Sequence, residues 1–160
     1  VCRGIDYKTL SNRQAAKFRT SSIGFIFQSY QMLPELTVLE NVSLPAMINS
    51  VSGNEYKRRA EELLCRVGLA DRLKHRPDEL SGGEQQRAAI ARAMINNPSL
   101  ILADEPTGNL DSKTGAGILE LFRQLHEERY GRTIIMITHD EKVASLSDSI
   151  ATLADGKITV

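Results

Sequence analysis

The stretch Leu100-Ile-Leu-Ala-Asp104-Glu105 indicates the fold class. Its continuous apolar run, without polar alternation, is typical of a strand that is covered on both faces of a parallel sheet. Asp104 and Glu105 then stand at the carboxyl end of the strand, the edge at which open α/β sheets bind ligands. Thr133-Ile-Ile-Met-Ile137 repeats the pattern, and the segment between the two runs carries an apolar stripe at helical spacing. We therefore predict an α/β fold with a right-handed strand-helix-strand crossover.

Two adjacent carboxylates at this edge suit nucleotide hydrolysis. Asp104 can hold Mg²⁺, directly or through water, and Glu105 can polarise the attacking water as a general base. For the pair alone, two acids that simply end a strand and face solvent are an equally good interpretation. The motifs around the pair favour the catalytic one.

The segment Leu80-Ser-Gly-Gly-Glu-Gln-Gln-Arg87 precedes an alanine-rich run with strong helix propensity. Its glycines are common at any loop-to-helix junction. A helix start also presents unpaired N–H groups and a favourable dipole, and glycines permit close backbone approach. A phosphate can therefore bind there with the Ser81 hydroxyl as a donor.

Further elements follow from caps and periodicity. Capping boxes at Ser11-x-x-Gln14 and Thr37-x-x-Glu40 predict two helix starts. A buried strand at Ile23-Gly-Phe-Ile-Phe27 places Gln28 at a strand end.

Three further segments predict a break in the chain, an amphipathic helix and a tight turn. Gly53 and Asn54 are expected to break the chain. An amphipathic helix over 60–67 is expected to end at Gly68, and Asp155-Gly156 predicts the turn of a terminal hairpin.

The motifs together resemble those of one family. Leu80 to Gln86 resembles the signature motif of ATP-binding-cassette (ABC) ATPases, and Leu100 to Glu105 resembles their Walker B strand with its catalytic glutamate. Gln28 is similar to the Q-loop residue, Asn109-Leu-Asp111 to the D-loop, and His139 to the switch histidine. Taken singly, His139 is more often a packed or surface residue and Gln28 an ordinary polar one. Their order along the chain makes the resemblance specific.

Within the family, four segments look most like the ATPases of lipoprotein-releasing systems and macrolide exporters. They are Ile23 to Gln28, Leu33-Pro34, Glu40 to Val42, and Asp104 to Asp111.

The resemblance implies a P-loop NTPase (RecA-like) core with an inserted α-helical ABC subdomain. One partial domain would fill residues 1–160, with the helical subdomain at about 30–97 and the core sheet at about 98–160. The family's phosphate-binding Gly-x-x-x-x-Gly-Lys-Ser/Thr loop does not occur in the sequence. Because the chain opens on Val1 with no signal segment, we expect a truncation that removes this loop and the N-terminal β-subdomain.

The resemblance also implies roles for individual residues. Glu105 and His139 would be catalytic, His139 by contacting the γ-phosphate and fixing the attacking water. Gln28 and Asp104 would hold Mg²⁺. The residues expected to bind ATP are Gln28, Ser81, Gly82, Gly83, Gln85, Asp104 and Asp111.

By the same resemblance, the intact protein would be an ATP-hydrolysing homodimer that powers a transmembrane permease for export or lipoprotein release. It would lie in the cytoplasm, on the inner face of the cell membrane. The truncated chain is expected to have little or no ATPase activity alone. A cell-division-type cassette, a non-transport ABC ATPase and a non-catalytic module remain alternatives. The cargo is not encoded in this chain.

Composition agrees with these expectations. Twenty basic and twenty acidic residues cancel, which gives no electrostatic case for nucleic-acid binding. No apolar run approaches the roughly 20 residues that cross a bilayer. Cys2 and Cys65 match neither a metal-ligand spacing nor a disulfide framework, which favours a reducing cytosol.

Overall fold

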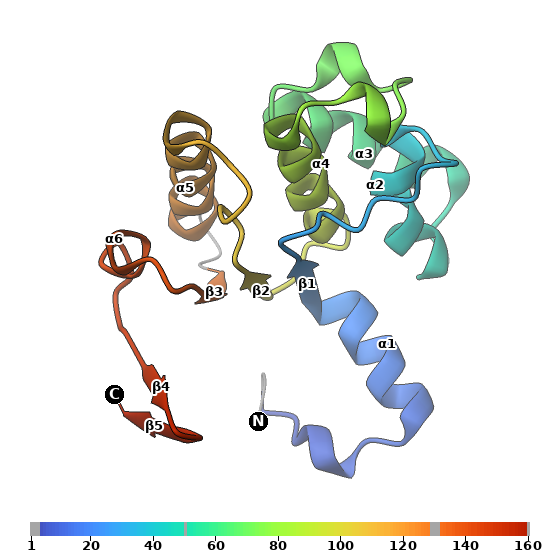
Figure 1. The fold of residues 1–160 in the computed structure, drawn as a ribbon. Helices are drawn as coiled ribbons and strands as arrows, with labels where there is room; N and C mark the ends of the chain where they lie inside the picture. The colour runs from blue at the N-terminus through green and yellow to red at the C-terminus, as the bar shows by residue number, and fades with distance from the viewer. Residues whose placement is uncertain (1–3, 50, 129–131, 160) are drawn as a thin grey trace.

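A parallel sheet forms the centre of the computed structural model, which describes residues 4–49, 51–128 and 132–159. Its order is β1 (Ile23–Ile26), β2 (Leu100–Asp104) and β3 (Thr133–Ile137) (Figure 1). Leu102 of β2 pairs with Phe25 on one side and with Ile135 on the other. The predicted α/β fold with a strand-helix-strand unit is confirmed.

Two helices cover one face of this sheet (Figure 1). They are α4 (Gly82–Met94), which packs on β1, and α5 (Ser112–Glu127), which connects β2 to β3. Ile101, Ile118 and Ile90 are completely buried between the helices and the sheet.

The opposite face of the sheet is open, so the expectation that both faces are covered is wrong for the described residues. Phe25 is 36%, Ile135 51% and Ile137 64% exposed. The parallel register places Phe25 and Ile135 on the same face, on either side of Leu102. The apolar runs of β2 and β3 therefore indicate strand identity correctly but not the number of layers.

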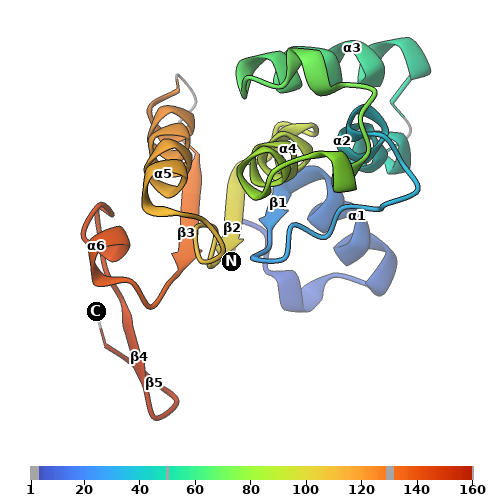
Figure 2. The ribbon, with the colours of Figure 1, turned by 45° about the horizontal axis from the view of Figure 1, so that its top comes forward.

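A second hydrophobic cluster joins α4 to α2 (Val38–Ile48) and α3 (Gly53–Arg66) (Figure 2). Two 3₁₀ turns, η2 (Ala70–Arg72) and η3 (Pro77–Glu79), connect α3 to α4. Ala88, Ala91 and Ile95 face this cluster, whereas Ile90 and Met94 face the sheet. The α4 segment thus contributes side chains to two hydrophobic cores.

Both predicted capping boxes are present. Ser11 and Gln14 cap α1 (Asn12–Ser22), which follows the 3₁₀ turn η1 (Tyr7–Thr9), and Thr37 and Glu40 cap α2.

The expected break at Gly53 and Asn54 is wrong. Gly53 is the first residue of α3, which follows Ser52 at the N-cap position, and Asn54 is the second. Gly68 follows the helix with a φ of +76°, in agreement with a glycine C-cap.

The C-terminal part contains α6 (Glu141–Ala144) and a hairpin of β4 (Thr152–Ala154) and β5 (Lys157–Thr159). Asp155 and Gly156 have φ values of +48° and +74°, which produce the tight turn that the sequence predicts. The last residue expected in the hairpin, Val160, lies outside the described residues. No described helix is both long and apolar enough to cross a membrane.

Candidate functional site

The acidic pair lies where β2 ends. Asp104 is exposed, and its carboxylate has no hydrogen bond or ion pair with any described residue. Glu105 adopts a left-handed backbone conformation with a φ of +43°, which turns the chain away from the strand direction. Hydrogen bonds hold this conformation on both sides: the Glu105 N–H donates to the Ile137 carbonyl at 2.9 Å, and the Gly108 N–H donates to the Glu105 carbonyl at 3.1 Å.

Glu105 and His139 meet across the ends of β2 and β3. One carboxylate oxygen of Glu105 accepts the backbone N–H of His139 at 3.0 Å and lies 2.5 Å from His139 Nδ1. The Glu105 side chain is only 18% exposed, whereas the His139 side chain is 84% exposed. The hydrogen bond that Glu105 accepts from His139 and the charge of the carboxylate raise the pKa of His139 above its ordinary value of 6.5. The structure thus brings together the two residues predicted to be catalytic.

Gln28 belongs to a loop that lies beside the turn after Glu105. Its Nε2 donates to Asn109 Oδ1 at 3.3 Å, and Asn109 Nδ2 donates to the Gln28 carbonyl at 3.0 Å. Gly108 allows this approach, since a β-carbon there would lie 3.0 Å from Gln28 Nε2. The reciprocal pair fixes the two site loops to each other.

Gln28 lies just after β1 and Asp104 is the last residue of the neighbouring parallel strand β2, at the same edge of the sheet. Within the described part of the chain, no group of three or more His, Cys, Asp or Glu residues could hold a metal ion. Magnesium usually takes one or two protein oxygens and completes its shell with water and substrate phosphates. The unpaired carboxylate of Asp104 and the amide of Gln28 fit that donor set.

The other predicted binding segment begins α4. Ser81 is the N-cap, and its hydroxyl donates to Glu84 Oε2 at 2.8 Å while the Ser81 N–H donates to the same oxygen at 2.9 Å. The Ser81 backbone N–H and the Arg72 side chain lower the pKa of Glu84 to about 2. The Gln85 side chain donates back to the Leu80 carbonyl at 3.2 Å.

Packing constrains Gly83 more tightly than Gly82. A β-carbon at Gly83 would collide with Thr114 Cγ2 of a short side chain, whereas one at Gly82 would lie 2.9 Å from the hydroxyl at the far end of the Tyr30 side chain. Close backbone approach to a phosphate is therefore not needed to explain Gly83.

Asp111, predicted to bind the nucleotide, is the N-cap of α5. Its carboxylate accepts the N–H groups of Lys113 and Thr114 at 3.1 Å and the Thr114 hydroxyl at 2.5 Å. The bonds from Thr114 hold the pKa of this carboxyl below its usual range. In this structure Asp111 caps a helix, and a contact with nucleotide remains a prediction.

The predicted site residues form two separate groups. Glu105, His139 and Gln28 lie around the ends of the parallel strands, whereas Ser81 and Gln85 lie at the start of α4. Among the described residues, no hydrogen bond joins the first group to Ser81 or Gln85. The residues predicted to bind ATP are thus divided between the two groups.

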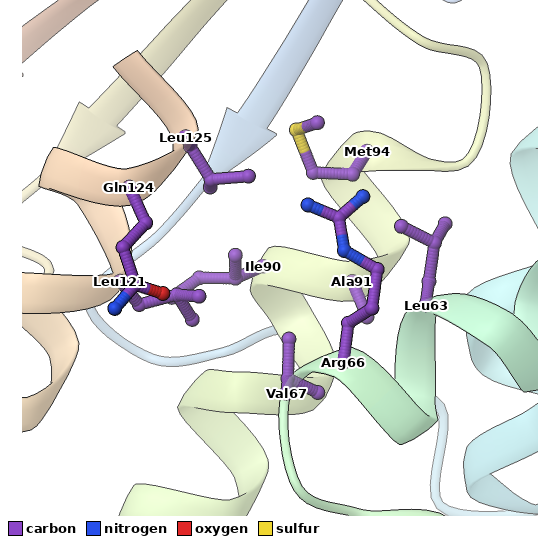
Figure 3. Close-up of a pocket in the computed structure, with 9 residues that line it drawn as sticks. All are labelled: Leu63, Arg66, Val67, Ile90, Ala91, Met94, Leu121, Gln124 and Leu125. Carbon is purple, nitrogen blue, oxygen red and sulfur yellow. The ribbon is translucent and has the colours of Figure 1, made fainter. Parts of the chain in front are cut away.

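Two cavities lie away from both groups. One, of about 40 Å³, is lined by side chains of α3, α4 and α5 (Figure 3) and has room for only a few water molecules. The other, of about 290 Å³, follows β1 between Arg19 and Arg92. Neither is lined by Glu105 or His139.

Comparison with known proteins identifies the family. The family described as ABC transporter matches residues 3–108. The chain belongs to the ABC transporter family.

Among its curated relatives, this ABC chain is 54% identical over 158 residues to an uncharacterised ABC transporter ATP-binding protein of Thermotoga maritima. The match covers 99% of this chain and 67% of that protein. This chain is also 54% identical over 142 residues to the lipoprotein-releasing system ATP-binding protein LolD of Syntrophotalea carbinolica. That match covers 89% of this chain and 62% of LolD. This chain is 49% identical over 155 residues to the macrolide export ATP-binding/permease protein MacB of Bartonella henselae. That match covers 97% of this chain and 23% of MacB. The chain thus spans at most about two thirds of the length of these relatives.

The fold also matches a solved ABC structure. A dimeric ATP-binding cassette in a post-hydrolysis state, bound to ADP and Pi, superposes with a TM-score of 0.85 and 43% sequence identity. The match covers 98% of this chain and 70% of that one. The predicted fold class is confirmed.

Several residues that shape the site of this ABC chain were not predicted. The Thr138 hydroxyl donates to Glu105 at 3.5 Å; its position directly before the switch histidine was the available signal. Arg92 of α4 donates to the carbonyls of Tyr30 and Gln31, two residues with positive φ in the loop after Gln28. No sequence pattern indicates that an arginine in this alanine-rich helix holds a loop that lies about sixty residues upstream.

Proposed function

We propose that this chain carries the hydrolytic part of an ATP-binding and ATP-hydrolysing ABC subunit that powers a membrane permease of the export or lipoprotein-release type. The observation that supports it most strongly is the Glu105–His139 pair, 2.5 Å apart, beside the unpaired carboxylate of Asp104 at the edge of a parallel sheet. A shielded carboxylate held by an exposed histidine suits general-base chemistry at a phosphate group.

In this proposal Glu105 accepts the proton of the attacking water. Its left-handed backbone and the N–H of His139 orient the carboxylate. With Nδ1 of His139 directed at Glu105, Nε2 is left to contact the γ-phosphate. Because the pKa of His139 is raised, its imidazole keeps a proton, and hence a positive charge, to higher pH than an ordinary histidine.

Gln28 and Asp104 would hold Mg²⁺. When bound, the ion would neutralise charge on the phosphates of ATP. The Gln28–Asn109 pair keeps the amide of Gln28 close to the turn that follows Glu105.

The start of α4 would bind the nucleotide held by a second subunit. Free N–H groups and the helix dipole favour a phosphate near Ser81, Gly82, Gly83 and Gln85. To donate to that phosphate, the Ser81 hydroxyl must turn away from Glu84. Because a similar solved cassette is dimeric, we propose a homodimer in which each site combines the two parts from different subunits, with Asp111 close to their interface.

The phosphate cradle itself is not part of this sequence. We therefore propose that the 160 residues alone have little or no ATPase activity, and that the gene product to which they belong hydrolyses ATP. We also propose that it works at the cytoplasmic face of the membrane, attached through its permease. The permease would determine the cargo.

The test is ATP hydrolysis by the gene product in the presence of Mg²⁺. We expect Glu105→Gln to lower kcat at least about a hundredfold while nucleotide binding is retained, because only the general base is lost. Glu62→Gln, an exposed carboxylate on α3 that pairs with Arg58, is the control and should leave kcat unchanged. Wild-type turnover in the Glu105→Gln variant would contradict the proposal.

A further inference from the structure

Gln86 is a completely buried polar residue in the middle of the molecule. Its side chain is 0% exposed, on the face of α4 that looks toward the turn after Glu105. Its Nε2 donates to the Pro106 carbonyl at 2.7 Å. Its Oε1 is buried and has no hydrogen-bond partner among the described residues. Leaving a buried acceptor unpaired costs stability. We therefore expect the bond from Gln86 to Pro106 to have a role other than stabilising the fold.

Two other buried polar side chains, Asn41 and Ser43, differ from Gln86 in their surroundings. Asn41 is also buried, but its amide bonds three carbonyls and the Leu33 N–H, and so satisfies a loop beside its own helix. Ser43 bonds the Leu39 carbonyl within its own helix. Gln86 instead reaches a carbonyl twenty residues away, outside its helix.

Pro106 directly follows Glu105, which has the strained left-handed backbone. The Glu105 N–H is held by Ile137, and its carbonyl is held by Gly108. The bond from Gln86 fixes the next carbonyl along the chain. Because a proline has no N–H of its own to anchor the turn, this carbonyl is the hydrogen-bonding group that Pro106 offers.

The same helix begins at Ser81, so Gln86 lies between the two groups of site residues. The capping box around Ser81 and Glu84 and the close contact of Gly83 with Thr114 fix the start of α4. The Gln86 side chain then connects the body of that helix to the carbonyl beside Glu105.

We infer that Gln86 is a positioning residue, which holds the Pro106 carbonyl and thereby keeps the Glu105 carboxylate directed at His139, and which connects movements of α4 to Glu105. This inference rests on the proposed function for its effect on turnover, whereas its structural part does not require nucleotide. It predicts that Gln86 influences the turn at Glu105 without being needed for the fold.

The test is Gln86→Met in the gene product. Methionine is similar in length and volume and removes both the donor and the unpaired oxygen, so we expect the helix to pack as before. The first readout is amide hydrogen exchange. Exchange at Gly108, whose N–H bonds the Glu105 carbonyl, should be about fivefold faster, whereas the central amides of α4 should keep their rates. Gln124→Met, at an exposed glutamine of α5, is the matched control. It should change neither the exchange rate at Gly108 nor the rates of the central amides of α4.

The second readout is steady-state ATP hydrolysis. We expect kcat to fall about tenfold or more in Gln86→Met with KM nearly unchanged, because a misplaced general base slows the chemical step and not substrate binding. Unchanged exchange at Gly108 would overturn the inference. Faster exchange throughout α4 would also overturn it, since Gln86 would then be part of the scaffold.

Failure of the proposed function gives a different pattern. If the wild-type protein hydrolyses no ATP, the proposed function fails, and exchange at Gly108 still decides the role of Gln86. If Glu105→Gln abolishes turnover and Gln86→Met leaves both kcat and exchange unchanged, the proposed function stands and only the positioning role is lost.

Discussion

At the residue scale, the decisive contact is the one between Glu105 and His139. Each residue was predicted from its own motif, but their contact depends on the parallel register that pairs Asp104 with Ile137. The left-handed backbone of Glu105, which costs of order 1–3 kcal/mol, is what turns its carboxylate toward β3. The sequence around an acidic pair carries no signal for such strain, so the geometry of the pair could not be predicted.

The pKa of His139 tests this contact directly. It is raised by the hydrogen bond and charge of Glu105, so the pair contributes stability at low pH and loses it as the pH rises through the folded-state pKa. Glu105→Gln should bring the pKa of His139 down toward 6.5, and an NMR titration of the imidazole measures it. Asp140→Asn is the control, because the charge of Asp140 is the smallest of the contributions that raise this pKa. An equal fall in the pKa of His139 in both variants would contradict the contact between Glu105 and His139.

At the scale of elements, α4 contacts the turn after Glu105 and the loop after Gln28. One of its faces packs on the sheet and the other on α2 and α3, while its side chains hold the turn at Pro106 and the loop at Tyr30. The glycines at its start and the alanine-rich run predicted the helix itself. Its long-range contacts could not be predicted, because periodicity assigns residues to faces and not to partners.

The start of α4 offers a prediction about packing. In Gly83→Ala, a β-carbon would collide with Thr114 Cγ2, so we expect a loss of about 1–2 kcal/mol in the free energy of unfolding despite the better helix propensity of alanine. Thr114→Ser removes that methyl group and keeps the hydroxyl that bonds Asp111. The double variant should therefore recover most of the loss in urea denaturation. Additive losses would show that the two residues do not collide.

At the scale of the whole molecule, the described residues leave one face of the sheet open. The expectation of two covered faces failed because a continuous apolar strand indicates an apolar environment on both faces. It does not indicate which segment provides that environment. The order of the main strands and helices was predictable, since they carry caps, apolar stripes or turns, whereas α6 and the 3₁₀ turns were not predicted. The division into a helical subdomain at about 30–97 and a core sheet at about 98–160 remains a prediction.

The open face predicts the behaviour of the isolated 160 residues. Phe25, Ile135 and Ile137 form an exposed apolar surface on β-strands, which favours association between molecules. We expect the chain to aggregate at micromolar concentration, and Ile135→Thr to reduce aggregation because threonine keeps β-propensity and adds a polar group. Light scattering measures it. Met47→Thr, at an exposed apolar residue of α2, is the control, and an equal benefit from both variants would contradict a specific role of the sheet face.

The central claim is that each ATP site combines the Glu105 group of one subunit with the Ser81 group of another. The most direct measurement is ATP hydrolysis by an equal mixture of Ser81→Arg and Glu105→Gln gene products, refolded or co-expressed so that subunits exchange. Each variant alone should be inactive, and the mixture should recover about a quarter of wild-type activity, because half of the dimers then contain one intact site. A mixture no more active than its separate components would contradict the shared site.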